Sequence, residues 1–150
     1  MKRYVLGFCF SPSMRSVVLV KKMRPSWQAG YLNGVGGKVE HMESFEDAMQ
    51  REFSEEAGYF GPLKWVRFGT LCCPETEVAL FWSRIEVVPL PFHVHQGEVV
   101  SAHFVDIVLQ KGESQGCPVV PDLSYFLPMA LHHVDNGDCF MEVTVPPPAR

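Results

Sequence analysis

Three glutamates close to the end of a short helical pattern are the residues best suited to chemistry. In residues 34–59, GVGGKVEHMESFEDAMQREFSEEAGY, apolar side chains recur every three or four positions, which is typical of an amphipathic helix. At about 100° per residue, Glu52 and Glu56 lie on the apolar side and Glu55 is adjacent to them. Charged side chains normally face outward, so this inward acidic cluster indicates that a positive charge binds there.

The energetic cost of the cluster points to the kind of cation. Glu52 and Glu56 are a like-charge i,i+4 pair, which costs roughly 0.2–0.5 kcal/mol. The helix dipole disfavours each anion near the C-terminal end by about 0.3–1 kcal/mol. A divalent cation would offset both costs, and crowded hard oxygen ligands suit Mg²⁺, for which Mn²⁺ can substitute. The alternative is a solvated acidic helix end that binds no metal.

Local signals place the two ends of this helix. Ser44 can cap the N-terminus, and Asp47 completes a capping-box pattern. Gly58 stands where a left-handed residue usually ends a helix. The glycines at 34, 36 and 37 do not form a GxxxxGK[ST] phosphate loop, so we expect them to permit close backbone approach instead. These signals predict a glycine-rich loop that leads into one amphipathic helix.

The spacing of these residues resembles the Nudix box, G-x5-E-x7-R-E-U-x-E-E-x-G-U, in which U is a bulky apolar residue. Residues 37–59 match every fixed position, with aromatic residues at the two U positions: Gly37, Glu43, Arg51, Glu52, Phe53, Glu55, Glu56, Gly58 and Tyr59. The resemblance implies a Nudix-type α/β/α sandwich with a mixed β-sheet. It also implies that residues 1–150 form a single domain.

The resemblance further implies a Mg²⁺-dependent enzyme that hydrolyses a phosphoanhydride bond of a nucleoside diphosphate-linked substrate. The implied metal ligands are three carboxylates and one backbone carbonyl: Glu52, Glu55, Glu56 and Gly37. Glu52 would be the general base, while Glu98 is the other candidate for the base and a further candidate metal ligand. Arg51 precedes Glu55 by four residues, so it can pair with it. Glu43 would anchor the loop or reach the metal through water.

Two segments resemble the base-binding parts of enzymes that hydrolyse oxidised purine nucleoside triphosphates. The run 33–39, NGVGGKV, is similar to the run in which the residue matching Asn33 binds the base. Residues 121–128, PDLSYFLP, are similar to a segment that carries two adjacent aspartates. Asp122 matches the first aspartate, but Leu123 replaces the second, and this departure leaves selectivity for oxidised guanine open.

Four more residues are candidate substrate contacts. Trp27 either stacks on a base or packs on the core, and packing is the more ordinary role. Lys22 and Arg24 follow a predicted strand together with Lys21, and they either contact phosphate or form a solvated charge cluster. Lys38, inside the glycine-rich run, is the fourth candidate substrate contact.

Three functions remain open from the sequence. The first is a MutT-like hydrolase that converts a nucleoside triphosphate, with an oxidised purine base among the candidates, to the monophosphate and pyrophosphate. The second is an ADP-ribose or nucleotide-sugar pyrophosphatase, for which the motive is Pro74, fifteen residues beyond Tyr59. The third is a non-catalytic nucleotide-binding module, which would be expected to have lost glutamates of the box.

Composition excludes other classes of function. The formal net charge of −4 argues against a protein that binds polymeric nucleic acid or a membrane surface. We find no signal peptide and no apolar run of about 18 residues. The five cysteines show no CxxC spacing, so we expect reduced thiols and a cytoplasmic protein. The expected partner is a small nucleotide, and the expected assembly is a monomer or a homodimer.

The remaining elements are predicted from alternation and turn signals. We expect strands over 3–10, 16–21, 63–72, 78–88, 102–108 and 139–145, and a second helix over 122–133 that begins at Asp122 and is kinked at Pro128. Residues 89–97 are expected to form a loop in which His93 and His95 share a face, an arrangement that could bind a metal. Residues 146–150 are expected to be a frayed tail.

Overall fold

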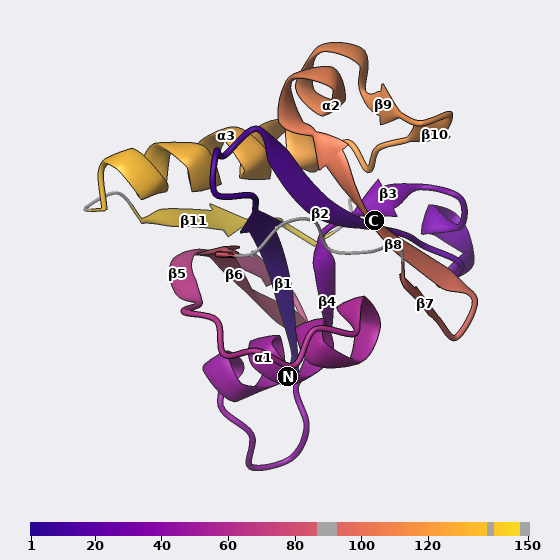
Figure 1. Ribbon diagram of the computed structural model, residues 1–150. Helices are drawn as coiled ribbons and strands as arrows, with labels where there is room; N and C mark the ends of the chain where they lie inside the picture. Colours follow the sequence, from indigo (N-terminus) through magenta and orange to yellow (C-terminus); the bar gives the residue numbers. More distant parts are fainter. Residues whose placement is uncertain (87–92, 138–139, 148–150) are drawn as a thin grey trace.

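The computed structural model describes residues 1–86, 93–137 and 140–147. A nine-stranded mixed sheet lies between helices (Figure 1). Helix α1 (Phe45–Ala57) covers one face, while α2 (Val105–Lys111) and α3 (Leu123–Asp135) lie on the other side. This arrangement confirms the predicted α/β/α sandwich.

The sheet has the order β11-β5-β6-β1-β2-β8-β7, with β3 beside β2 and β4 beside β1. Its strands are β1 (Lys2–Phe10), β2 (Ser16–Lys21), β3 (Leu32–Asn33), β4 (Val35–Lys38), β5 (Val66–Cys73), β6 (Thr76–Arg84), β7 (His93–His95), β8 (Glu98–Phe104) and β11 (Met141–Thr144). The β1–β6 and β5–β11 pairs are parallel, and the other pairs are antiparallel. The short strands β9 (Glu113–Ser114) and β10 (Cys117–Pro118) form a separate hairpin.

Alternation along the central strands creates two apolar cores. In β1, Phe8 and Phe10 belong to the core beneath α2 and α3, while Val5 and Cys9 belong to the core beneath α1. Successive residues of a strand point to opposite faces, so one apolar strand supplies both cores. Burial also raises the pKa of the Cys9 thiol to about 12, and this cysteine is therefore inert.

Helix α1 forms where its local signals predict. The hydroxyl of Ser44 accepts a hydrogen bond of 3.0 Å from the backbone N–H of Asp47, and Gly58 ends the helix in the left-handed conformation at φ 66°. Met49 and Phe53 are fully buried on the inward side. Burying one side chain of this size stabilises the folded state by about 1.5–3 kcal/mol, so packing on the sheet fixes the rotation of the helix.

The largest difference from the expected elements follows β8. A strand was expected over 102–108, but β8 begins at Glu98 and ends at Phe104, and the next seven residues form α2. Val105 and Val108 are the buried residues of α2, and their spacing of three is helical rather than alternating. Gly112 ends α2 at φ 63°, which is the signal that could have identified the helix.

Several smaller differences concern loops. The glycine-rich run was expected to be a loop, but it forms β4, which pairs with β1. In the expected loop 89–97, residues 89–92 lie outside the described residues and His93–His95 form β7. The segment before Asn33 contains the short 3₁₀ helix η1 (Ser26–Gln28). The expected strand over 63–72 begins three residues later. Residues 87–88 and 139 of the expected strands, and 148–150 of the expected tail, lie outside the described residues.

The described helices include none with the length and apolar character required to span a membrane. Pro128 lies within α3 as expected. Cys9, Cys72, Cys73 and Cys117, the described cysteines, are free thiols.

Candidate active site

Strand β4 brings the backbone of two glycines against β1 and α1. A Cβ atom at Gly36 would collide with the backbone carbonyl of Val5, and one at Gly37 would collide with the carboxylate of Glu52. Only glycine permits this approach. The carboxylate of Glu52 therefore lies directly against the peptide backbone whose carbonyl is the predicted metal ligand.

The three glutamates of α1 differ in burial. Glu56 is 8% exposed, and its Oε2 atom has no hydrogen-bond partner among the residues that the structure describes. Glu52 is half-buried, while the Glu55 side chain is 49% exposed. The inward direction predicted for Glu52 and Glu56 is therefore observed, and Glu55 lies at the solvent boundary.

Electrostatics at Glu56 follow from this burial. Desolvation raises the pKa of Glu56 to about 7, and the negative charges of Glu52 and Glu98 act in the same direction. The Lys22 ammonium and a backbone hydrogen bond from Gly36 oppose the increase in this pKa. Burial also raises the pKa of Glu52, despite the guanidinium of Arg51. A cation is the group that this environment lacks.

Arg51 connects the glycine-bearing strand, the loop before α1 and the helix itself. Its Nε and Nη2 atoms donate to the two carboxylate oxygens of Glu43 at 2.8 and 3.0 Å, and Nη1 donates to Glu52 at 2.9 Å. Nη2 also donates to the carbonyl of Lys38 at 3.0 Å. The predicted pairing with Glu55 is present but longer, at 3.4 Å. Glu43, which accepts two of these hydrogen bonds, is therefore the main partner of Arg51. This contact agrees with the first of the two roles expected for Glu43, which is to anchor the loop.

Glu98 lies at the first position of β8 and is 6% exposed. The Lys22 ammonium donates to its Oε1 atom at 3.2 Å, and the backbone N–H of Met23 donates to its Oε2 atom at 2.8 Å. Arg24 donates to the side chain of Gln96 at 2.9 Å. Three consecutive residues after β2 are thus attached to the turn before β8 and to its first residue, a contact that no local sequence pattern reveals.

Asn33 is held by its neighbours on the other side of this loop. Its amide nitrogen donates to Gln28 at 3.2 Å, and its amide oxygen accepts from the N–H of Gly34 at 2.8 Å. Sequence reasoning missed Gln28. Trp27 is 70% exposed, so the expectation that it packs on the core is wrong, because η1 projects this side chain into solvent.

The segment before Asp122 runs beside Asn33. The N–H of Val120 donates to the carbonyl of Leu32 at 2.9 Å, and Leu32 and Val119 form a parallel bridge. The two segments expected to bind the base are therefore neighbours. Asp122 is the N-cap residue of α3, as expected, but it adopts helical angles and its side chain makes no capping bond. The Asp122 side chain is exposed and does not cap the helix.

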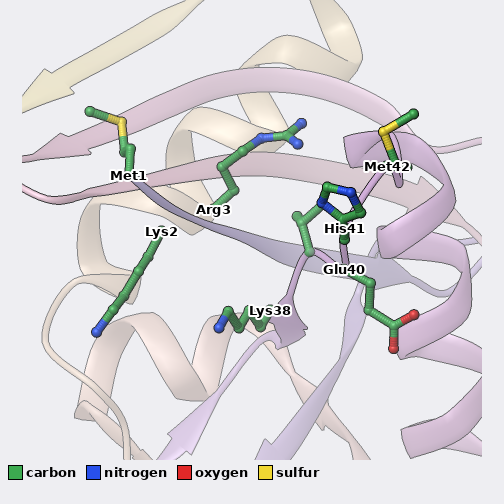
Figure 2. Close-up of a pocket in the computed structure, with 8 residues that line it drawn as sticks. Met1, Lys2, Arg3, Lys38, Glu40, His41 and Met42 are labelled. Atoms are coloured by element: carbon green, nitrogen blue, oxygen red, sulfur yellow. The ribbon is translucent and has the colours of Figure 1, made fainter.

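Lys38 faces a different part of the surface. Together with Lys2 and Arg3 it lines a hollow of about 280 Å³, and the neighbouring residues Glu40, His41 and Met42 line it as well (Figure 2). None of the three α1 glutamates lines this hollow. The structure thus separates Lys38 from the group formed by Lys22 and Glu98.

His93 contacts the C-terminal end of α1. Its Nδ1 atom donates to the carbonyl of Glu56 at 2.7 Å, and its ring lies against Gly58, where a Cβ atom would collide with it. This nitrogen is committed to the helix end and cannot ligate a metal. The role of His93 is to satisfy a carbonyl that the helix leaves unpaired.

Within the described residues, no three His, Cys, Asp or Glu side chains converge closely enough to form a ready metal cage. Protein cations hold several of the acids instead, because Arg51 binds Glu52 and Glu55, and Lys22 binds Glu98. The unpaired buried oxygen of Glu56 is the observation that fits a bound cation. The residues therefore fit a divalent ion that replaces part of this pairing.

Solved structures with the same fold include three bacterial proteins. A Nudix hydrolase from Nitrosomonas europaea is 16% identical with a TM-score of 0.71, over 97% of this chain and 79% of that one. A MutT/nudix family protein from Enterococcus faecalis is 17% identical with a TM-score of 0.61, over 90% and 62%. MutT, from work on Aliivibrio salmonicida and Vibrio cholerae, is 20% identical with a TM-score of 0.58, over 90% and 98%. These likenesses show the fold.

A search of curated protein sequences returned no match. The model of the NUDIX domain matches residues 1–117, which include β4, α1, Lys22 and Glu98. Members of this family generally use divalent metal ions and act on small nucleotide substrates. The chain therefore belongs to the Nudix domain family of pyrophosphohydrolases.

Proposed function

We propose that this enzyme hydrolyses (d)NTPs to the monophosphate and pyrophosphate, with oxidised purine (d)NTPs as the substrates to test first. The observation that supports the reaction type is the unpaired, buried oxygen of Glu56, a residue that accepts a backbone hydrogen bond from Gly36 of the glycine strand. The observation that supports the substrate class is the adjacency of Asn33 to the segment that carries Asp122, through the Leu32–Val120 hydrogen bond.

We assign the metal site to Mg²⁺, for which Mn²⁺ can substitute. The ligands would be the carboxylates of Glu52, Glu55 and Glu56, the carbonyl of Gly37 and, after it leaves Lys22, Glu98. When bound, such an ion lowers the pKa of water and neutralises charge on phosphate oxygens. Arg51 keeps Glu52 and Glu55 oriented, since it donates to both.

Glu52 is the favoured general base. Both oxygens of Glu98 already accept hydrogen bonds, from Lys22 and from Met23. Among the described residues, Glu52 accepts one side-chain hydrogen bond, from Arg51 to its Oε1 atom, and burial raises its pKa. A raised carboxylate pKa increases its ability to take a proton from attacking water.

The substrate would lie across the loop between β2 and β3. The exposed ring of Trp27 offers a stacking surface for the base, and Asn33, oriented by Gln28, offers an amide edge. Lys22 and Arg24 lie on the same loop, and we assign them as the phosphate contacts. Lys38 is also proposed as a substrate contact, but its side chain lines the hollow of Figure 2, which none of the α1 glutamates lines.

A substrate panel with Mg²⁺ tests the proposal. Canonical (d)NTPs, 8-oxo-dGTP, ADP-ribose and nucleotide sugars are each incubated with the enzyme, and the phosphate-containing products are resolved by chromatography. We expect monophosphate and pyrophosphate from at least one (d)NTP. Rapid cleavage of ADP-ribose with no turnover of any (d)NTP would establish the alternative. Pro74, the motive for that alternative, lies in the β5–β6 turn, where proline is common.

Trp27→Ala provides a sharper test of base recognition. We expect KM to rise about 5–150-fold with a small change in kcat, because base–aromatic stacking is worth about 1–3 kcal/mol. Tm should stay unchanged, since the side chain is 70% exposed. The exposed Phe60, which lies outside both segments expected to bind the base, provides a matched aromatic control as Phe60→Ala. An unchanged KM in Trp27→Ala would exclude stacking.

We also propose a cytoplasmic location and a monomeric or homodimeric state. The free thiols at the described cysteines support a reducing compartment. Light scattering of the purified protein and fractionation of expressing cells are the corresponding measurements.

A further inference from the structure

The ammonium group of Lys22 lies among carboxylates that the proposed function assigns to a metal ion. Its Nζ atom is 3.2 Å from Oε1 of Glu98, and the two side chains are only 15% and 8% exposed. The same ammonium acts electrostatically on Glu56, the buried glutamate with an unpaired oxygen. One protein cation therefore serves two acids from different elements, α1 and β8.

The backbone holds Lys22 in this place. Its N–H donates to the carbonyl of Tyr31 at 2.8 Å, and its carbonyl accepts from the N–H of Gly30 at 2.7 Å. The next residue adds the bond from Met23 to Glu98. The position of the ammonium is thus a consequence of the fold rather than of a freely moving surface side chain.

We propose that Lys22 is a positioning residue that acts as the internal counter-ion of the metal site and is displaced when a divalent ion binds. The inference rests on the proposed metal site and adds a residue outside the Nudix box that sets its affinity. Without a cation, Glu56 and Glu98 would be two buried like charges, which the fold tolerates poorly. Lys22 supplies one positive charge until an ion with two replaces it.

Two consequences follow for the protein without metal. Lys22 stabilises the fold, because it neutralises Glu98 in a site with little solvent. It also competes with the metal, because an incoming ion must break the ion pair to use the same carboxylate. Removing the positive charge should therefore lower the stability of the metal-free protein and raise its affinity for metal.

The test compares Lys22→Met with Lys21→Met in the full chain. Lys21 is the adjacent lysine at the end of β2, and its side chain is exposed, so the two variants lose the same charge in the same region. Binding of MnCl₂ is measured from the electron paramagnetic resonance signal of free Mn²⁺, without substrate. We expect Mn²⁺ to bind about three- to tenfold more tightly to Lys22→Met, and with unchanged affinity to Lys21→Met.

Thermal unfolding provides the second readout. In EDTA, we expect the Tm of Lys22→Met to fall by about 4 °C or more, while that of Lys21→Met stays at the wild-type value. Saturating MnCl₂ should raise the Tm of Lys22→Met more than that of the wild type. Lys22→Gln loses the same charge but can still donate to Glu98, so it replaces Lys22→Met if that variant does not fold. Lys22→Arg keeps the charge and should keep the wild-type affinity.

Glu56→Gln separates this inference from the proposed function. If Glu56→Gln binds Mn²⁺ as well as the wild type, the proposed metal site is wrong, and the role of Lys22 is lost with it. If Glu56→Gln loses affinity but Lys22→Met binds Mn²⁺ no more tightly than the wild type, the metal site stands and the role of Lys22 is overturned. Equal affinities in Lys22→Met and Lys21→Met would overturn it as well.

Discussion

Two carboxylates at opposite ends of helix α1 are balanced in different ways. Glu43, just before the helix, receives two hydrogen bonds from the guanidinium of Arg51, at 2.8 and 3.0 Å. Glu56, in the last turn, has a buried oxygen without a hydrogen-bond partner among the described residues, and the Lys22 ammonium and a backbone bond from Gly36 only partly offset the effect of its burial. The protein thus pairs the Glu43 carboxylate fully with its own residues and leaves the Glu56 carboxylate only partly paired.

The pKa values of the two acids move in opposite directions for this reason. The guanidinium of Arg51 lowers the pKa of Glu43, while desolvation raises that of Glu56. A bidentate guanidinium pair is rigid and specific, which suits a residue that holds a loop. An unpaired buried carboxylate lowers the free energy of unfolding. A protein can keep such a residue where a bound ligand offsets this loss.

The largest effect should come from Glu56→Gln. We expect kcat to fall about 10²–10³-fold, because one charged ligand of the metal site is lost. The metal-free variant should unfold at a Tm no lower than that of the wild type at pH 8, where the wild-type carboxylate, with its pKa of about 7, is ionised and unpaired. Glu55→Gln, at the solvent boundary, provides the comparison. Full activity in Glu56→Gln would move the chemistry elsewhere.

The next effect should come from Glu43→Gln, with the opposite pattern. We expect a loss of stability of about 1–3 kcal/mol at pH 7, since Arg51 loses its charged bidentate partner. Mn²⁺ affinity should change much less than in Glu56→Gln. Because the pKa of Glu43 is lowered by folding, its stabilising contribution is present above the ordinary value of 4.5 and is lost as the pH falls through the lowered value.

Denaturant unfolding at pH 7 and at about pH 3 measures this contribution. The difference between Glu43→Gln and the wild type should become smaller as the pH falls below 4.5, because the carboxylate is protonated first in the unfolded state and then, at a lower pH, in the folded state. Equal stabilities at pH 7 would show that the Arg51 pair does not anchor the loop.

The smallest effect should come from His93→Phe, which removes the hydrogen bond to the carbonyl of Glu56 while keeping an aromatic ring against Gly58. We expect a loss of about 0.5–1.5 kcal/mol in the free energy of unfolding. Activity should fall less than in Glu56→Gln, because the side chain of Glu56 is not touched. A loss of Mn²⁺ affinity as large as that of Glu56→Gln would instead make His93 part of the metal site.

Local sequence was sufficient for the helix and its acidic face. Ser44 and Gly58 specify the ends through bonds within a few residues, and the 3.6-residue period places Glu52 and Glu56 on the buried side. The pattern of residues 3–10 similarly predicted the strand β1. Alternation alone misled at residues 102–108, because a short apolar run fits a strand or a helix and only packing against the sheet made 105–111 helical.

Only the tertiary structure decided which charges meet. Lys22 and Glu98 are 76 residues apart, and their contact depends on the pairing of β2 with β8. The same is true of Asn33 and the segment before Asp122, which meet because Val120 bonds to Leu32. Periodicity tells which way a side chain points from its own element, but the partner it finds there depends on the order and register of strands, which no local pattern carries.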